Sequence, residues 1–430
     1  MDSFEIQTPK SDPPDRKALR QNVIAMLTDS GAFGGALGFM GYSTVMPALV
    51  FQLTSSEPLV GLINTLWTGM WLLPQLPAGR WMADRPRKKP ILLVTAVIAR
   101  VPVLLFALAL ALNLDRMLLF ALLTLMVLMF RGGDSVTAVA WFDSISKMLP
   151  PNIRGRILGW TQAIAFVLQF GVSFLVTWGL SASAPAFPQN YALLFGLAGL
   201  GLMVSTCALL FFIEPPGDVS NNVSGQLNIS AHARHILKND RAFRQSSIAR
   251  LLIGINALAL PFYAVHAIKY LGLPEDLLGA FLAAQTIGGV VSALITGSIS
   301  ERYGARIVIR MTMLLAMIPP VLGILLNLIG PQGGGVLIVG NVLIFAAMGA
   351  TDGSFLLGFL QYIIEIAPPV ERTAYTGLAN TIGGLTVIAS LLGGILLQAT
   401  SYPVLFIAAV LGPVLGLLVA WGLPKVAHQP

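Results

Sequence analysis

The sequence repeats one pattern of residues at a distance of 218 positions (352 − 134 = 218 for the first pair). Each copy has an acid inside an apolar segment, followed by a Pro-Pro pair, an arginine and a glycine. The anchors are Asp134, Pro150, Arg154 and Gly159 in the first copy, and Asp352, Pro368, Arg372 and Gly377 in the second. A repeat of about half the chain, with an acid hidden in apolar sequence in each copy, is typical of membrane transporters built from two related halves.

Apolar runs long enough to cross a lipid bilayer fill most of the chain. Of its 430 residues 56% are hydrophobic and 10% are charged, and the charged residues gather between the apolar runs. A soluble domain has roughly 25% charged residues, and one crossing takes ~20 mostly apolar residues. We therefore predict an all-α membrane protein with twelve transmembrane helices. The predicted spans are 22–51, 58–80, 90–112, 117–146, 157–180, 190–213, 246–270, 277–299, 307–329, 335–366, 373–399 and 402–423.

A polar interval after the sixth span divides the predicted helices into two pseudo-symmetric bundles of six. We predict a cytoplasmic N-terminal tail at residues 1–21 and an N-terminal bundle at 22–213. A cytoplasmic linker at 214–245, a C-terminal bundle at 246–424 and a cytoplasmic C-terminal tail at 425–430 complete the chain.

Lysine and arginine gather in the loops on one side of the predicted membrane. That side also holds both termini and the linker, whereas the opposite side has only Arg116 and Lys269. Because basic loops stay in the cytoplasm, we predict cytoplasmic termini and a place in the plasma (inner) membrane. The same bias accounts for the net charge of +7 without a nucleic-acid partner. The basic loop residues are Arg80, Arg85, Arg87, Lys88, Lys89, Lys147, Arg154, Arg156, Arg302, Arg306 and Arg372.

Two loops at corresponding places in the halves carry related motifs. Between the second and third spans the sequence reads Gly79-Arg80-Trp81-Met82-Ala83-Asp84-Arg85-Pro86-Arg87-Lys88-Lys89, and between the eighth and ninth it reads Gly297-Ser298-Ile299-Ser300-Glu301-Arg302-Tyr303-Gly304-Ala305-Arg306. These loops resemble the signature of the major facilitator superfamily, Gly-x-x-x-Asp-Arg-x-Gly-Arg-Arg/Lys. The second copy has Glu301 in place of the aspartate, and the first has Arg80 and Arg87 at the two glycine positions. With the six-plus-six layout, the resemblance covers all twelve spans.

The resemblance implies alternating access, in which two six-helix bundles rock about a central cavity lined by spans 1, 4, 7 and 10. A carboxylate near a helix N-terminus gains ~0.3–1 kcal/mol, so we expect Asp84 to cap span 11 and Glu301 to cap span 5. The loop arginines would then reach acids on spans 4 and 10 and hold an inner gate shut. The alternative is that these basic loops only set the topology. The predicted inner-gate residues are Asp84, Arg85, Asp143, Arg154, Glu301, Arg302, Glu365 and Arg372.

Five charged residues stand within apolar runs, where each costs a few kcal/mol unless it faces a partner or a wet cavity. Four of them, Asp29, Arg100, Arg131 and Asp134, lie in the first half at similar depths. Two acids and two bases cancel in charge. We therefore predict that these four side chains form a buried charge network.

The second half has one deep acid, Asp352, and no deep base, because Arg250 and Arg310 stand near the inner ends of their spans. Desolvation of an unpaired carboxylate favours its neutral form, which is what a proton carrier needs. We predict that Asp352 takes up and releases a coupling proton and that Asp134, its repeat equivalent, is the partner site restrained by Arg131. The alternative is a structural acid that is hydrogen-bonded to a backbone carbonyl or to Thr351.

Other polar groups on the presumed cavity helices are candidates for the substrate site. His266 stands near the outer end of the seventh predicted span, where a lone histidine is more often a capped or solvated residue than a ligand. Pro261 in the same span is expected to kink the helix beside the cavity. The predicted cavity residues are Tyr42, Asn256, Tyr263, His266 and Asn380. The sequence shows no phosphate-binding loop and no cluster with metal-ligand spacing, so we expect neither an enzyme, nor a cofactor, nor a metal site.

These patterns favour a secondary active transporter that moves a small solute by alternating access, coupled to protons. The expected partners are the solute, protons and the lipid bilayer, with the protein acting as a monomer. The fifth span lacks the Gly-Pro pair common in drug exporters of the family, which favours uptake. Three alternatives stay open: efflux of amphipathic compounds, a non-transporting sensor, and a lipid-translocating protein on the same scaffold.

Overall fold

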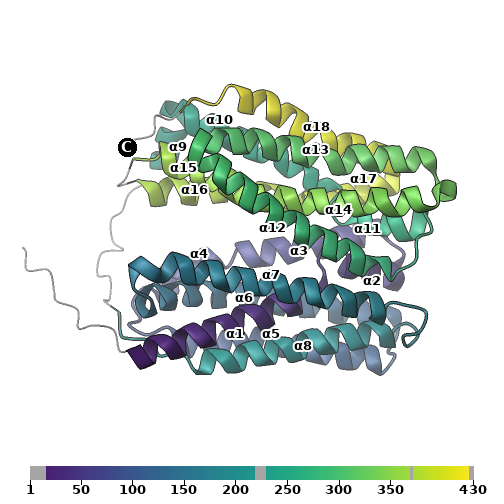
Figure 1. Cartoon of the computed structure of the whole chain (residues 1–430), viewed down its shortest axis with the longest axis horizontal. Coiled ribbons are helices and arrows are strands. Elements are labelled where there is room, and N and C mark those ends of the chain that lie inside the picture. Colours follow the sequence, from purple (N-terminus) through teal and green to yellow (C-terminus); the bar gives the residue numbers. More distant parts are fainter. Residues whose placement is uncertain (1–15, 218–228, 369–370, 426–430) are drawn as a thin grey trace, which may run out of the picture.

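The structure is a computed structural model that describes residues 16–217, 229–368 and 371–425. Most of the predicted N-terminal tail, part of the predicted linker (218–228) and the residues from 426 lie outside these ranges. Within them the chain forms helices joined by turns and contains no strand, which confirms the predicted all-α architecture. The helices gather into two groups, which lie one above the other in Figure 1.

The first group contains eight helices, and a further helix belongs to the predicted linker. The eight are α1 (Arg16–Met40), α2 (Val45–Thr54), α3 (Glu57–Leu72), α4 (Gln75–Met82), α5 (Lys89–Ala111), α6 (Arg116–Met148), α7 (Pro151–Gly179) and α8 (Gln189–Leu210). The linker helix is α9 (Ile229–Asn239). We call α1–α8 the N-half.

The second group, which we call the C-half, has more interruptions along its helices. Its α-helices are α10 (Arg241–Gly254), α11 (Phe262–Val265), α12 (Leu277–Tyr303), α13 (Ala305–Ile329), α14 (Gly335–Phe355), α15 (Gln361–Ile366), α16 (Arg372–Gly384), α17 (Ala389–Ala399) and α18 (Tyr402–Trp421). Short 3-10 or π turns join or extend them: η1 (Ile255–Leu258), η2 (His266–Tyr270), η3 (Pro331–Gly333), η4 (Leu356–Leu360) and η5 (Leu385–Ile388).

By length and hydropathy, eleven helical segments of the described chain are able to span a bilayer, one fewer than predicted. The difference lies in the predicted span 58–80, which is divided at Leu73 and Pro74. The resulting α3 has 16 residues and α4 has 8, so neither is long enough alone. Proline lacks a backbone N–H and cannot continue the helical ladder, and the break at Pro74 divides the predicted span into these two short helices.

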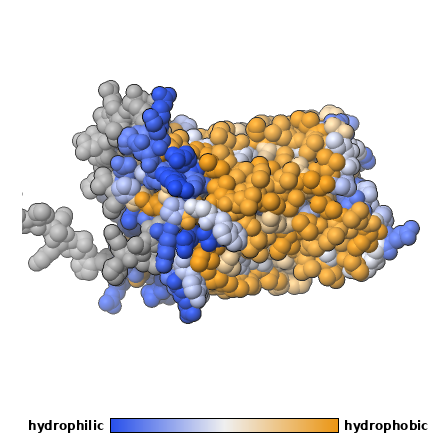
Figure 2. All heavy atoms as spheres, turned by 90° about the horizontal axis from the view of Figure 1, so that it is seen from above, coloured by the Kyte–Doolittle hydropathy of each residue, from blue (hydrophilic) through white to orange (hydrophobic). Residues whose placement is uncertain are grey.

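A broad hydrophobic band covers the face seen in Figure 2, and hydrophilic residues gather at its two ends. At one end α1 begins, α9 lies and α18 ends (Figure 1). We call this end the linker face and the opposite end the far face. Exposed leucines and valines, such as Leu294 and Val167, are what a lipid-facing surface requires.

The two halves share one apolar core only toward the far face. That core includes Phe39 and Phe106 of the N-half together with Phe281, Phe345 and Phe406 of the C-half. Toward the linker face the buried clusters are separate: one lies within the N-half, one within the C-half, and one joins the linker helix α9 to the C-half. The halves are therefore packed together at the far face and divided toward the linker face.

Glycines allow the closest helix contacts inside and between the halves. A Cβ on Gly34 of α1 would lie 2.6 Å from the Cβ of Ala165 on α7, so only glycine lets these helices pack. Gly41 ends α1 with a φ of +36°, a conformation that glycine adopts at low cost. This turn between α1 and α2 places Tyr42 and Ser43 at the boundary with the C-half.

Candidate functional site

Two adjoining cavities lie between the halves. One, of about 830 Å³, is lined by α1, α3, α6 and α7 of the N-half and by α12 and α14 of the C-half. The other, of about 440 Å³, is lined by α3 together with α10, α14, α16 and their neighbouring turns. Tyr42 and Asp352 line both cavities, and so do Thr68 and Trp71. Both volumes fall in the range of small-molecule binding sites, roughly 300–1,000 Å³.

Asp352 of α14 stands at the junction of these cavities with its side chain exposed to them. Tyr42 of the N-half donates a hydrogen bond from Oη to Asp352 Oδ2 at 3.3 Å. Ser43 donates to Gln285 Oε1 on α12 at 2.7 Å, and Gln285 lines the 830 Å³ cavity together with Asp352. No Lys, Arg or His lies within 4.0 Å of this carboxylate among the described residues.

Close packing of α12 against α14 places Gln285 beside Asp352. A Cβ on Gly349 would meet the backbone of Gln285, and a Cβ on Gly353 would meet the backbone of Gly289. Because neither position tolerates a side chain, the two helices approach until Gln285 and Asp352 lie together. The sequence shows these glycines but not which helix they face.

Arg250 of α10 lines the same 440 Å³ cavity as Asp352, although its place near a helix end suggested otherwise. It donates from Nη2 to Asn380 Oδ1 on α16 at 3.1 Å. Its Cζ lies 5.5 Å from the ring centroid of Phe355, one helical turn from Asp352. The helix starts at Arg241, behind an Asp240 side chain that caps it, five residues earlier than the predicted span. Arg250 therefore lies deeper than a count from the apolar run indicates.

Four of the five predicted substrate residues line the 440 Å³ cavity: Tyr42, Asn256, Tyr263 and Asn380. His266 does not. It is fully buried among the rings of Tyr270, Tyr402 and Phe406, with its Nε2 3.3 Å from Asn327 Oδ1. The sequence pattern did not indicate four further polar residues of the cavity wall, Asn64, Thr68, Thr386 and Ser390. Thr351 also lines the cavity, and its hydroxyl donates to the carbonyl of Ala347 at 2.8 Å.

The backbone of the seventh span is broken beside this cavity. A 3-10 turn, η1, follows α10, and α11 begins only after Pro261. Asn256 lies in the turn and donates to the carbonyl of Ala316 at 3.1 Å. Irregular backbone at membrane depth is tolerated where it lines a cavity, so the break that Pro261 predicts does lie at the cavity wall.

The four deep charges of the N-half form two pairs. Arg100 lies 3.8 Å from Asp29 Oδ1 and also donates to Thr206 Oγ1 at 2.9 Å. Asp29 accepts further bonds from Ser205 and from Trp141 Nε1, the latter at 2.9 Å. These partners come from α1, α5, α6 and α8, so the pair fastens four helices together.

The second pair, Arg131 and Asp134, lies on α6 with Nη1 and Oδ2 3.4 Å apart. Arg131 also donates to the carbonyl of Trp67 at 2.9 Å, and its Cζ lies 4.6 Å from that ring's centroid. Asp134 is buried and lines a third cavity of about 360 Å³ within the N-half, together with Asp29 and Arg100. Arg131 instead lines the 830 Å³ cavity, which it shares with Asp352.

Hydrogen bonds join the halves at the far face. Ser390 of α17 donates to Asn64 Oδ1 of α3 at 3.0 Å, and the Leu391 N–H donates to Thr65 Oγ1 at 3.1 Å. Gln52 donates to Glu275 across the same boundary. The contacts between the halves therefore lie on the far-face side of the cavities, whereas the buried clusters toward the linker face are separate.

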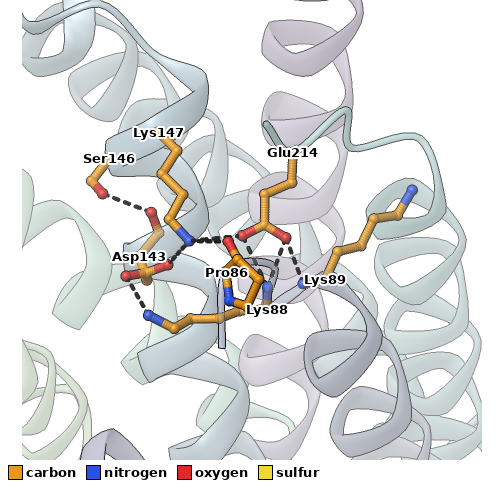
Figure 3. A network of polar contacts seen from close by, with 7 residues as sticks. All are labelled: Pro86, Lys88, Lys89, Asp143, Ser146, Lys147 and Glu214. Atoms are coloured by element: carbon orange, nitrogen blue, oxygen red, sulfur yellow. Dashed lines mark hydrogen bonds and ion pairs between the residues drawn. The ribbon is translucent and has the colours of Figure 1, made fainter. Parts of the chain in front are cut away.

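A charged cluster fastens the linker-face end of the N-half, as Figure 3 shows. Asp143 accepts from Lys88 at 2.7 Å and from Lys147 at 2.5 Å. Glu214 accepts from the backbone N–H groups of Lys88 and Lys89, at 2.9 and 2.7 Å, where α5 begins. A carboxylate does cap a helix here, but it is Glu214 of the same half, which no pattern in the sequence singled out.

The other predicted gate residues lie around the linker face. Arg85 stacks over Trp81 at 4.6 Å, and Arg154 donates to the carbonyls of Ser146 and Leu149 at the end of α6. Arg302 and Glu365 line a small cavity between α12, α13 and α15. Asp84 ends the turn after α4, Glu301 lies in the last turn of α12, and Arg372 begins α16.

Comparisons with known proteins place the fold. The model of a family described as Major Facilitator Superfamily matches residues 28–385 and 245–430. Uncharacterized proteins of Mycobacterium tuberculosis and Mycobacterium bovis are 26% identical over 284 residues, which is 64% of this chain and 54% of theirs. The chain thus spans about half the length of these curated relatives.

Solved transporter structures share the arrangement of helices. A bacterial homologue of the iron transporter ferroportin in an inward-facing state aligns with a TM-score of 0.67 at 15% identity, covering 94% of this chain and 98% of the other. The nucleoside transporter NupG aligns with a TM-score of 0.63 at 12% identity, covering 94% and 98%. A bacterial homologue of the lysosomal transporter Spinster, inward-facing and occupied, gives 0.63 at 15% identity, covering 97% and 98%. At these identities the likeness establishes the fold alone.

Proposed function

Because this chain belongs to the Major Facilitator Superfamily, we propose that it carries a small solute across the membrane by alternating access, driven by a proton that binds Asp352. As a multi-pass membrane protein of this family it is a transporter in the general sense. The solute, the coupling ion and the direction are the parts proposed here. The observation that carries the proposal is the place of Asp352, at the junction of both cavities and of both halves.

The contacts of Asp352 link its protonation to the movement of the halves. An ionised carboxylate accepts a charge-assisted hydrogen bond from Tyr42, which is stronger than a neutral one. Proton binding weakens this bond between the halves, and proton loss strengthens it. Loss of the proton therefore stabilises the state that is closed at the far face, and proton uptake favours its opening.

Asp134 is proposed to assist proton exchange at Asp352 without carrying the proton itself. The ion pair with Arg131 stabilises the charged form of Asp134, whereas Asp352 has no basic partner of this kind. Arg131 lines the 830 Å³ cavity together with Asp352. We infer that Arg131 and Asp134 set the electrostatic potential in which Asp352 exchanges its proton.

The linker face is proposed to be cytoplasmic, in the plasma membrane, because basic residues gather in its loops. The state described here is then inward-facing. In the opposite state the linker-face ends of the halves close, and Asp84, Arg85, Glu301 and Arg302 are proposed to form the inner gate. We propose that the protein acts as a monomer, because the two halves that move against each other in alternating access belong to the same chain.

The test is transport by purified protein in liposomes, over a solute panel, with and without a pH gradient and in both directions. Asp352→Asn is expected to abolish the dependence on the gradient while leaving solute exchange at equal pH. Asp115→Asn is the matched control, because Asp115 caps α6 through its side chain and asparagine caps equally well. Gradient dependence that survives in Asp352→Asn would refute the proton role. Movement of labelled lipid without any solute transport would instead favour lipid translocation.

A further inference from the structure

We propose that Arg250 is an anion-binding residue and that the transported solute is a small amphipathic organic anion, with a carboxylate or phosphate group. The inference rests on the proposed transport function, because it assigns the 440 Å³ cavity to the solute. It starts from the partners of the deep arginines of this chain.

Arg250 is the deep arginine whose partners are neutral. Arg100 lies against Asp29, and Arg131 lies against Asp134. Arg250 donates one bond, to the amide oxygen of Asn380, and no acid lies within 4.0 Å of it among the described residues. A guanidinium has five N–H donors, so most of those of Arg250 remain available on the cavity wall.

The neighbouring groups fix the orientation of the Arg250 guanidinium but do not neutralise its charge. Phe355 lies on one side, with its ring centroid 5.5 Å from Arg250 Cζ. Gly383 of α16 also packs against the guanidinium, since a Cβ built there would lie 2.8 Å from Nε. A planar fork held in this way is suited to bind a carboxylate or phosphate through two parallel hydrogen bonds.

Part of the cavity wall is apolar and fits the hydrocarbon body of such a solute. This part is formed by Leu72, Ile253, Leu260, Met348 and Val387. Arg250 lies nine residues from the start of α10, or roughly 14 Å from the linker-face end of that helix. Asp352 lies fourteen residues from the end of α15, or roughly 21 Å from the same face. The anionic group would therefore point toward the linker face, with the apolar body deeper.

Asp352 links anion binding to proton binding. Asp352 and Arg250 both line the 440 Å³ cavity, and one helical turn plus the Phe355 contact allows a separation of roughly 10 Å between their charged groups. At an effective dielectric constant of about 20, an ionised Asp352 would weaken binding of an anion at Arg250 by about tenfold. Protonation removes this repulsion, and by reciprocity the bound anion raises proton affinity equally. Solute and proton would therefore move together.

The experiment measures ligand-induced thermal stabilisation of the purified protein without any gradient. The probes are monocarboxylates from acetate to 2-naphthoate, each beside its uncharged amide, and phenyl phosphate as a separate arm. At least one oxyanion is expected to raise the unfolding temperature of the wild type while its amide does not. The phosphate arm tells which oxyanion the site prefers.

The variants assign any such effect to the proposed site. Arg250→Gln is expected to need at least a tenfold higher ligand concentration for the same rise in unfolding temperature. Arg250→Lys is expected to keep part of the stabilisation. Arg310→Gln is the control, because Arg310 lies on α13 in the same half and donates to the carbonyls of Ala420 and Trp421, away from the cavity. Equal unfolding temperatures without ligand establish that each variant is folded.

Two results would overturn the inference: no oxyanion stabilises the wild type, or the stabilisation persists in Arg250→Gln. Either would leave the proton role of Asp352 standing, because that role is tested by gradient dependence in liposomes. Conversely, Asp352→Asn is expected to bind the same oxyanion about tenfold more tightly at pH 7.5, since the repulsion is gone. Loss of gradient coupling and loss of anion binding are thus separate readouts.

Discussion

Closure of the far face depends on a glycine at which no side chain fits. A Cβ on Gly61 of α3 would lie 2.9 Å from the Leu391 Cα of α17, whereas ordinary contact begins at 3.4 Å. The helices would therefore have to separate by at least 0.5 Å (3.4 − 2.9) in Gly61→Ala. Because backbone atoms form this contact, no side-chain rotation can relieve it.

The cost of this separation follows from the hydrogen bonds beside Gly61. Ser390–Asn64 at 3.0 Å and Leu391–Thr65 at 3.1 Å would both lengthen to 3.5 Å or more, beyond a useful hydrogen bond. Each contributes about 1 kcal/mol net, so the closed state would lose about 2 kcal/mol. That shifts the equilibrium roughly thirtyfold toward the state open at the far face.

A distance measurement across the far face checks this prediction. Spin labels at Asn113 and Gln332, exposed in far-face loops of the two halves, report the separation in a Cys207→Ser background. Gly61→Ala is expected to populate a longer distance that is rare in the wild type. Gly196→Ala is the control, because a Cβ there meets nothing within 4 Å. An unchanged distance distribution in folded Gly61→Ala protein would refute the reasoning.

Two further predictions concern the charged clusters of the N-half. Glu214→Gln keeps the shape of the side chain but removes the charge at the start of α5, and should lower the unfolding free energy by roughly 1–2 kcal/mol in chemical denaturation. An unaltered unfolding midpoint would mean that the cap contributes nothing. For the buried pair, Asp29→Asn and Arg100→Gln should each destabilise by about 3–5 kcal/mol, and the double variant by much less than the sum. The 3.8 Å separation between Arg100 and Asp29 indicates a direct interaction. If the losses of the two single variants added up to the loss of the double variant, this interaction would be ruled out.

The course of the chain through the bilayer could be predicted from the sequence because hydropathy is a local property. The predicted span 277–299 is α12, Leu277–Tyr303, and the predicted 307–329 is α13, Ala305–Ile329. The predicted span 58–80 differs only where Pro74 separates α3 from α4. Deep charges such as Asp352 could also be found in advance, since a charge within apolar residues is costly wherever its partners lie.

The composition of the site depends on which helix faces meet, and hydropathy does not encode that. The apolar pattern predicts Arg250 near a helix end, yet α10 begins earlier, at the Asp240 cap, and Arg250 lies at the cavity wall. His266 has the polarity of a cavity residue but lies in an aromatic cluster.

The sequence by itself therefore determined the order of the apolar segments, the duplication and the presence of Asp134 and Asp352 within apolar segments. Only the tertiary structure decided that Arg131 pairs with Asp134, that Tyr42 reaches Asp352 across the halves, and that the far face is the closed one. The physical reason is that insertion energy is summed along a segment, whereas contacts between helices arise from close packing among residues hundreds of positions apart.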